Sequence, residues 1–372
     1  MNDIGTTGPT EADDIAERFQ CLHEFYKAAK DKLGPNEWDY LAGGAETETT
    51  QKRNRLAIDS LGFRPRVLRD VSDLNTHSEF LGRDLRLPVI LAPIGSLQDF
   101  DPAGGAAASS AAGEFGCAHM VSSVTKPGLE KTAEAAPDAA RIFQLYVRGD
   151  RNWVDDHVSR AIDQGYLAFC YTVDLDHYSR RERDIAKRYL STARRTVAQG
   201  EDYQARFTWD EVKRLQDKFD IPVILKGIAT AEDAAIAVEQ GVDVVYVSNH
   251  GGRQLDHGRG AFDTLPEIAE VCQGKAKVVV DGGIQRGTDI VKAIALGADA
   301  VGMGRMQGLA LAAAGQAGLV RMLELLEIEV RTAMALVGVT RLDQLDASYL
   351  HPAPAVVEPW AFSSFPLLDE GY

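Results

Sequence analysis

The chain has 372 residues, and its 40 basic and 55 acidic side chains give a formal net charge of −15. An acidic surface repels nucleic acid and anionic membranes, so neither is expected as a partner. This length suits one large barrel with terminal extensions, or two smaller domains. A small anionic substrate would need a local basic pocket.

The cysteines and the N-terminal segment carry little functional signal. Cys21, Cys117, Cys170 and Cys272 form no Cys-x-x-Cys pair and have no histidine at zinc-finger spacing, so no metal site is expected. Cys170 lies within an apolar run and is expected to be a buried thiol. Residues 1–17 lack the basic start and apolar stretch of a signal peptide, and no charge-free stretch is long enough to cross a bilayer. We therefore expect a cytoplasmic protein.

Residues 1–16 are rich in Gly, Thr, Pro, Asp and Glu, which predicts a mobile leader. Residues 15–42 follow with a helical pattern of apolar positions. From residue 88 onward, strand-like runs rich in Val, Ile and Leu alternate with helix-like stretches, as in parallel strands buried on both faces. The predicted strands are 88–95, 118–122, 142–147, 167–174, 222–227, 243–249, 276–281 and 300–304.

Examples of the helical stretches between these strands are 103–115, 153–164, 231–240 and 288–296, with Thr230 placed to cap the third. Eight such units predict an α/β fold, a TIM (β/α)8 barrel with an N-terminal helical extension, over residues 17–350. An open doubly wound sheet is the alternative. Residues 174–209 form a long polar connection, which indicates a lid or a binding loop. Long helices are predicted over 311–336. The tail, residues 351–372, carries prolines and aromatics and is expected to pack on a neighbouring subunit.

Most of the predicted strands end in polar or charged residues. In a barrel the carboxyl ends of all strands lie on one face, and active sites lie on that face. His250 is the candidate general base, and Asp174 can fix its tautomer. Arg253 has a fork suited to a carboxylate, and Lys226 suits a cofactor that gains negative charge on reduction. At the last two strands a phosphate site is predicted on Asp281, Gly282, Gly283, Gly304 and Arg305.

The residues 248–256, Ser-Asn-His-Gly-Gly-Arg-Gln-Leu-Asp, resemble the signature of the FMN-dependent α-hydroxy acid oxidase and dehydrogenase family. Similar matches lie at 39–45, 63–66, 92–95, 144–147, 172–174 and 226–227. The resemblance implies FMN as the cofactor, held by Pro93, Ile94, Gly95, Ser122, Gln144, Thr172, Lys226, Ser248 and the phosphate residues named above. It also implies that Tyr40, Arg181 and Arg253 hold the substrate carboxylate, and that Tyr146 bonds to the substrate hydroxyl while His250, backed by Asp174, takes a proton.

The chain departs from the family pattern at several positions. Gln285 replaces an arginine that usually follows the Asp-Gly-Gly stretch, so Arg305 and backbone amides would carry more of the phosphate charge. Met306 stands where proline is common. Val124 replaces the tryptophan of glycolate oxidases, and Gly95 replaces an alanine found in many oxidases. The last two changes make room above the flavin and predict a substrate bulkier than glycolate.

The expected reaction is oxidation of an L-2-hydroxy acid to the 2-keto acid, and both a hydride route and a carbanion route stay open. The alternatives are oxidation of an amino acid-like or peptide substrate, and a barrel that binds FMN without turnover. A nucleotide dehydrogenase is disfavoured because no cysteine follows a predicted strand end in the way its chemistry requires. Oxygen, a quinone and a redox protein all remain open as electron acceptor, and a homotetramer is expected.

Overall fold

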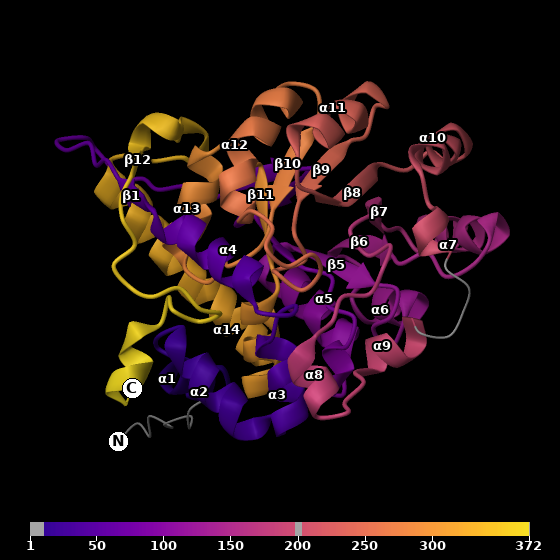
Figure 1. The fold of residues 1–372 in the computed structure, drawn as a ribbon. Coiled ribbons are helices and arrows are strands. Elements are labelled where there is room, and N and C mark those ends of the chain that lie inside the picture. Colours follow the sequence, from indigo (N-terminus) through magenta and orange to yellow (C-terminus); the bar gives the residue numbers. More distant parts are fainter. Residues whose placement is uncertain (1–10, 198–202, 372) are drawn as a thin grey trace, which may run out of the picture.

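The computed structural model describes residues 11–197 and 203–371. Its centre is a closed barrel in which every neighbouring pair of strands is parallel, as predicted (Figure 1). The barrel strands coincide with the predicted runs to within a few residues. They are β4 (Val89–Leu91), β5 (Ala118–Ser122), β6 (Ala140–Leu145), β7 (Ala168–Thr172), β8 (Val223–Ile228), β9 (Val244–Val247), β10 (Lys277–Val280) and β11 (Ala300–Met303).

Helices surround the strands, and apolar side chains from both layers form the large core between them (Figure 1). Thr230 caps α11 as predicted, because its side chain accepts a hydrogen bond from the backbone N–H of Asp233. The surrounding helices are α5 (Gly104–Phe115), α6 (Leu129–Ala135), α7 (Arg151–Asp163), α10 (Trp209–Lys218), α11 (Ala231–Glu239), α12 (Ala261–Cys272), α13 (Gly287–Ala295) and α14 (Arg305–Val337).

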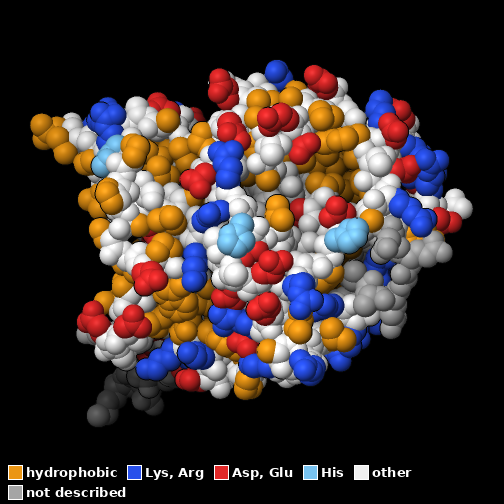
Figure 2. Space-filling model, in the orientation of Figure 1, with side chains coloured by type: hydrophobic (Ala, Val, Ile, Leu, Met, Phe, Trp, Pro, Cys, Tyr) orange, Lys and Arg blue, Asp and Glu red, His pale blue; other side chains and the backbone are white. Residues whose placement is uncertain are grey.

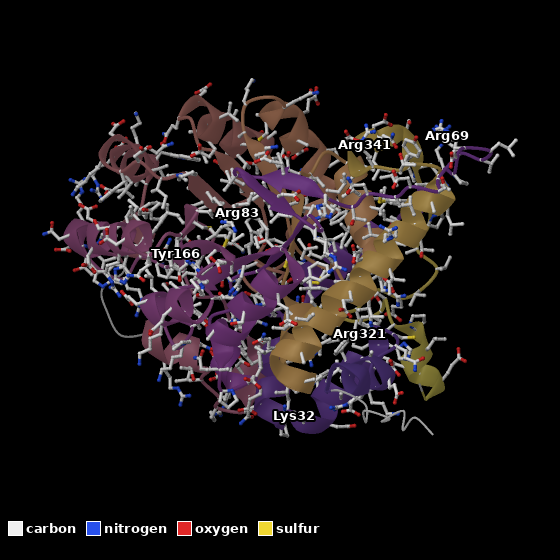
Figure 3. The ribbon with its side chains drawn as sticks, turned by 180° about the vertical axis from the view of Figure 1, so that it is seen from behind. Lys32, Arg69, Arg83, Tyr166, Arg321 and Arg341 are labelled. Atoms are coloured by element: carbon white, nitrogen blue, oxygen red, sulfur yellow. The ribbon has the colours of Figure 1, made fainter. Side chains whose placement is uncertain are left out.

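The helix α14 contains the predicted stretch 311–336, starts earlier at Arg305, and is kinked at Ala314 and Gly315. By length and composition it could cross a membrane, but 61% of its most apolar window is buried inside the protein. In Figure 3 it runs across the back of the molecule, where Arg321 donates through Nε to the carbonyl of Phe19. It is therefore a core helix that ties the barrel to the N-terminal segment.

The N-terminal extension is helical as predicted, but it is divided into α1 (Glu11–Arg18), α2 (His23–Lys32), α3 (Pro35–Ala42) and α4 (Thr49–Asp59). Gly34 and Pro35 explain one break, because Pro35 occupies the first position of α3. The predicted leader extended to residue 16, whereas a helix already begins at Glu11. Residues 1–10 lie outside the described part of the chain.

Smaller elements complete the barrel ends. The hairpin of β2 (Ser78–Phe80) and β3 (Arg83–Leu85) places Phe80 and Leu85 in the apolar cluster inside the barrel. The strands β1 (Leu61–Phe63) and β12 (Leu350–Pro352) pair antiparallel, so the predicted tail begins within a strand. The long connection contains α8 (Glu182–Ala186) and α9 (Thr192–Val197), and is therefore partly helical; its residues 198–202 are outside the described ranges. Short 3-10 turns occupy Leu97–Asp99, Gln204–Arg206, Leu342–Gln344, Ala347–Tyr349 and Pro366–Glu370.

The C-terminal tail packs against its own chain, and packing on a neighbouring subunit stays a prediction. Phe362 and Phe365 are buried, and the Phe362 ring meets the rings of Tyr26 and Trp38. The tail runs down one side of the molecule toward α1 and α2 (Figure 1).

Candidate active site

The strand periodicity explains how the polar residues of the site come together. Successive residues of a strand point to opposite faces, so every second residue of a barrel strand points inward. Met120, Ile142, Cys170, Ile224 and Tyr246 belong to the apolar cluster inside the barrel, as do residues of the other strands. Two positions later along these strands come Ser122, Gln144, Thr172, Lys226 and Ser248. With Asp281 they form a buried polar layer at the carboxyl ends of the strands.

This polar layer is held together by hydrogen bonds. Lys226 Nζ donates to Ser248 Oγ at 2.9 Å, and Ser248 Oγ donates to Asp281 Oδ1 at 2.7 Å. Gln144 Nε2 donates to Thr172 Oγ1 at 2.8 Å. Burial would lower the pKa of the Lys226 ammonium, but the carboxylates of Asp281 and Asp174 raise it above its ordinary value. Lys226 is therefore a buried cation, paired with the Asp281 carboxylate at 3.5 Å.

A pocket opens above this layer, with about 1030 Å³ of empty space including the part open to solvent. Most of the predicted site residues line it: Tyr40, Pro93, Ile94, Gly95, Tyr146, Arg181, Lys226, His250, Arg253, Asp281, Gly282, Gly283, Gly304 and Arg305. The other five are not part of the lining: Ser122, Gln144, Thr172 and Ser248 are buried in the polar layer, and Asp174 contacts His250. The structure thus brings all the predicted residues to one end of the barrel.

His250 and Asp174 form the central pair. His250 Nδ1 lies 2.9 Å from Asp174 Oδ1, and Tyr146 Oη lies 3.4 Å from the other ring nitrogen, Nε2. Burial lowers the pKa of the His250 imidazole below its usual value and outweighs the opposite effect of the Asp174 carboxylate. Burial would raise the pKa of Asp174, but His250 and Lys226 hold it below its ordinary value. The pair is therefore a neutral imidazole beside a carboxylate at neutral pH.

Three guanidinium groups gather in the same pocket. Arg253 Nη1 donates to the carbonyls of Tyr40 and Gly43, and Arg305 donates to those of Gly251 and Gly43. Arg181 Nε donates to the carbonyl of Arg253. Carbonyl oxygens bear no full charge, so these hydrogen bonds do not cancel the positive charges, which the nearby carboxylates of Asp184, Glu48 and Asp281 offset in part. Burial, with the nearby Arg253, accordingly lowers the pKa of Arg305 to about 9. A pocket with this excess of positive charge is suited to anionic ligands.

The predicted phosphate loop has the expected shape. Gly282 and Gly283 have φ values of 102° and 86°, which favour glycine, and the loop leads into α13 at Gly287. Gly304 faces open space at the next strand end, where an added Cβ would meet no atom within 4 Å. The side-chain amide of Gln285 is bonded to the C-terminal tail, so the expected reliance of the phosphate on Arg305 and backbone amides stays a prediction.

Several supporting residues were not predicted. Arg55 and Asp289 form a buried ion pair at 2.8 Å, and Arg55 also donates to the carbonyl of Gly283. Asp289 accepts from the backbone N–H groups of Gln285 and Arg286, which shapes the loop. Arg55 and Asp289 are 234 residues apart, so no local pattern could pair them. An acidic residue in the first turn of a predicted helix was the available signal for Asp289.

The long connection 174–209 is also held in place by residues that the sequence analysis did not identify. Arg183 donates to both carboxylate oxygens of Glu48, at 2.6 and 2.7 Å, and Lys187 pairs with Asp39. Gln254, within the signature segment, donates to the carbonyls of Asp174 and His177. These bonds hold the start of the lid against α3 and the signature loop.

Residues 29–352 match the model of the family described as FMN-dependent dehydrogenase. The chain belongs to this family. It is 38% identical to L-lactate oxidase of Nostoc sp. over 89% of this chain and 97% of the relative. It is 37% identical to glycolate oxidase 3 of Arabidopsis thaliana over 88% of this chain and 94% of the relative. As a member of the family, the chain is an FMN-dependent oxidoreductase.

Solved structures agree with this assignment. The crystal structure of mandelate oxidase superposes with a TM-score of 0.84 at 38% identity, covering 91% of this chain and all of the other. A single-residue variant of mandelate oxidase, solved with 2-hydroxy-phenylacetamide, gives the same TM-score and coverage. The family, the barrel and the FMN cofactor predicted from the sequence are therefore confirmed.

The pocket fits FMN on its own chemistry. Gln144 Oε1 is buried and has no hydrogen-bond partner among the described residues, so it offers an acceptor to an N–H group of a ring placed above it. Lys226 offers a buried cation on the same layer. The Gly282–Gly283 loop and the open space at Gly304 suit a phosphate. Among the residues that the structure describes, no group of three or more His, Cys, Asp or Glu side chains could hold a metal ion.

Proposed function

We propose that this protein oxidises an L-2-hydroxy acid to the corresponding 2-keto acid. FMN, when bound, supplies the chemistry of accepting two electrons. The relatives' names support a hydroxy acid as the substrate, since they include lactate, glycolate and mandelate oxidases. The observation that carries the proposal is the His250–Asp174 pair, which lies in one pocket with two arginines that can meet a carboxylate.

His250 is the proton acceptor in this proposal. If Nδ1 carries the hydrogen that is donated to Asp174, the lone pair of Nε2 faces the pocket beside Tyr146. The lowered pKa of His250 favours this role, because a neutral imidazole is the form that can accept a proton. Asp174 then stabilises the imidazolium that forms. Tyr146 holds the substrate hydroxyl near Nε2.

Arg181 and Arg253 bind the substrate carboxylate in this proposal, and Tyr40 completes the contact. The Arg253 guanidinium carbon lies 4.9 Å from the centre of the Tyr40 ring, so the ring helps to orient this cation, and both residues line the pocket. Burial, with the nearby Arg181, lowers the pKa of Arg253. An anionic substrate would relieve that repulsion, which favours carboxylates over neutral alcohols.

The substrate side chain is bulky and apolar. Val124, Tyr146 and Leu175 form a small apolar cluster with Tyr178 packed against it, and all four line the pocket. Gly95 lines the same pocket and leaves space that a larger side chain would fill. An aromatic 2-hydroxy acid matches this wall by stacking and by burial of apolar area. The structural neighbours named for mandelate support the same choice.

We further propose that oxygen is the electron acceptor, because the relatives and neighbours named above are all oxidases. Equal amounts of keto acid and hydrogen peroxide are then expected. We also propose a cytoplasmic location, and the net charge of −15 disfavours binding to nucleic acid or anionic membranes.

Assembly into a homotetramer is the proposed quaternary state. A projecting arm carries the exposed apolar residues Val67 and Leu68, and Leu336 on α14 is also exposed. Hydrophobic side chains cover the projecting tip in Figure 2, and Arg69, near this tip, is labelled in Figure 3. Exposed apolar groups of this kind mark interaction surfaces. Light scattering of the purified holoprotein tests this state.

The decisive experiment for the function is a substrate comparison. We expect kcat/KM to be higher for mandelate and 2-hydroxyoctanoate than for lactate, and lowest for glycolate. A clear preference for glycolate would contradict the bulky pocket. Oxidation of amino acids in place of hydroxy acids would show that the enzyme oxidises a C–N bond, which contradicts the proposal. Binding of FMN with no oxidation of either class would indicate a barrel without turnover.

A further inference from the structure

The C-terminal segment 360–365 lies outside the family match and yet reaches the active-site end of the barrel. The family match ends at residue 352. Beyond it, Phe362 is 0% exposed and Phe365 is 2% exposed, so this segment is part of the core. The position of this segment is therefore fixed by the contacts of its buried side chains.

Aromatic contacts fix the segment on the N-terminal helices. The Phe362 ring centre lies 5.1 Å from that of Tyr26 on α2 and 5.8 Å from that of Trp38 on α3. Trp360 adds an edge contact with Phe362 at 5.6 Å. Each such contact stabilises the packing beyond the area it buries. The segment is thereby held between these helices and the loop that follows β10.

Hydrogen bonds then join the segment to Gln285 in that loop. Gln285 Nε2 donates to the carbonyl of Ala361, and Ser364 Oγ donates to Gln285 Oε1. Gln285 is buried and lines the pocket two residues after Gly283. Both polar ends of its amide are therefore satisfied by the tail, and the next residue, Arg286, places its guanidinium carbon 5.9 Å from the Phe365 ring centre.

Gln285 is also one of the positions at which the chain departs from the family pattern. By the resemblance described above, a neutral amide stands here where the family usually has an arginine, and the partners of that amide lie in a segment outside the family match. Without the side-chain charge, phosphate affinity depends more on how the backbone N–H groups of the loop are aimed. A loop whose buried amide lost its partners would shift to satisfy them.

We propose that the C-terminal segment 360–365 acts as a strap that positions the phosphate-binding loop, residues 281–286, for FMN. Gln285 and Ser364 are positioning residues, and the strap acts through the loop and not by touching the flavin ring. This inference rests on FMN binding but not on oxidation of a hydroxy acid.

The test compares two flavins that differ only in the phosphate. The dissociation constants of FMN and riboflavin are measured on apoprotein by quenching of flavin fluorescence, for the wild type and for Ser364→Ala. We expect Ser364→Ala to raise the dissociation constant of FMN about fivefold, the effect of one lost hydrogen bond, and to change that of riboflavin by less than about twofold. Ser364→Thr keeps the hydroxyl and should restore FMN binding.

Ser363→Ala is the matched control, because among the described residues the Ser363 hydroxyl bonds only within the tail, to the backbone of Trp360. It should leave both dissociation constants within about twofold of wild type. In Gln285→Ala, the added Ser364→Ala change should cause no further loss. The proposal is overturned if Ser364→Ala leaves FMN binding unchanged, or if it weakens both flavins equally, as a purely structural role would. A protein that binds FMN with this strap effect but oxidises no hydroxy acid would contradict the proposed function alone.

Discussion

His250 and Asp174 come from the ends of β9 and β7, and their side chains meet at 2.9 Å between Nδ1 and Oδ1. The two residues are far apart in sequence, and they meet because the carboxyl ends of β7 and β9 lie at the same end of the barrel. Their ionisation is matched: burial lowers the pKa of the imidazole and keeps it neutral, while the carboxylate, with its own pKa lowered, remains charged.

This relationship predicts the pH dependence of kcat/KM. The base must be neutral, and its pKa lies below the ordinary value near 6.5, so activity should persist as the pH falls to that value and decline only below it. Asp174→Asn removes the charge that raises the pKa of His250. The acid limb should therefore move to lower pH while the plateau rate falls. Asp176→Asn, at an exposed neighbour, should leave the profile in place. An acid limb moving to higher pH in Asp174→Asn would contradict this electrostatic account.

Pocket size is tested at Val124. Val124→Trp fills the apolar wall beside Tyr146 and Leu175, so the ratio of kcat/KM for mandelate to that for glycolate should fall by at least about tenfold. Steady-state kinetics with both acids measure the ratio, and Val124→Ile serves as the control of similar shape. An unchanged ratio would show that the substrate side chain lies elsewhere.

The polar layer was predictable because barrel strands repeat with a period of two. Ser122, Gln144, Thr172 and Lys226 follow apolar residues at that spacing, so reading the strand ends was sufficient to place them. The signature segment around His250 indicated the family and the residue expected to accept a proton. Gly34 and Pro35 also mark one break between the N-terminal helices, although the apolar pattern alone predicts one continuous helical stretch.

The packing between distant segments was not predictable in the same way. Ser364 and Gln285 are 79 residues apart, and the tail gave only a composition of prolines and aromatics. That composition does not indicate that the rings of Tyr26 on α2 and Trp38 on α3 contact Phe362 of the tail. Such contacts depend on three-dimensional position, which local spacing does not encode.

The Arg55–Asp289 pair predicts a large stability effect. Both side chains are buried, so Arg55→Gln leaves the Asp289 carboxylate without its guanidinium partner and should lower the free energy of unfolding by about 3 kcal/mol. The exposed pair of Arg259 and Glu267 supplies a control, since Arg259→Gln should cost less than about 1 kcal/mol. Denaturant unfolding of the apoproteins measures both. Equal effects would argue against a structural role for the buried pair.

A second titratable group should affect stability and not catalysis. Burial lowers the pKa of His119 to about 3, with its Nδ1 at 2.7 Å from Ser109 Oγ. The unfolded chain therefore binds one more proton than the folded chain between pH 6.5 and about 3, and stability should fall with acidification by up to about 1.4 kcal/mol per pH unit over that window. His119→Gln should remove this contribution to the slope. Melting temperatures across this range check it, and an identical slope in the variant would refute it.

The central claim is that His250 takes a proton from a hydroxy acid held over FMN. Anaerobic mixing of the yellow holoprotein with mandelate, followed by flavin absorbance, tests it most directly in the wild type and in His250→Gln. We expect rapid bleaching of the wild type, and a variant that keeps its FMN but bleaches about 10² to 10⁴-fold more slowly. A variant that bleaches at the wild-type rate would contradict the claim.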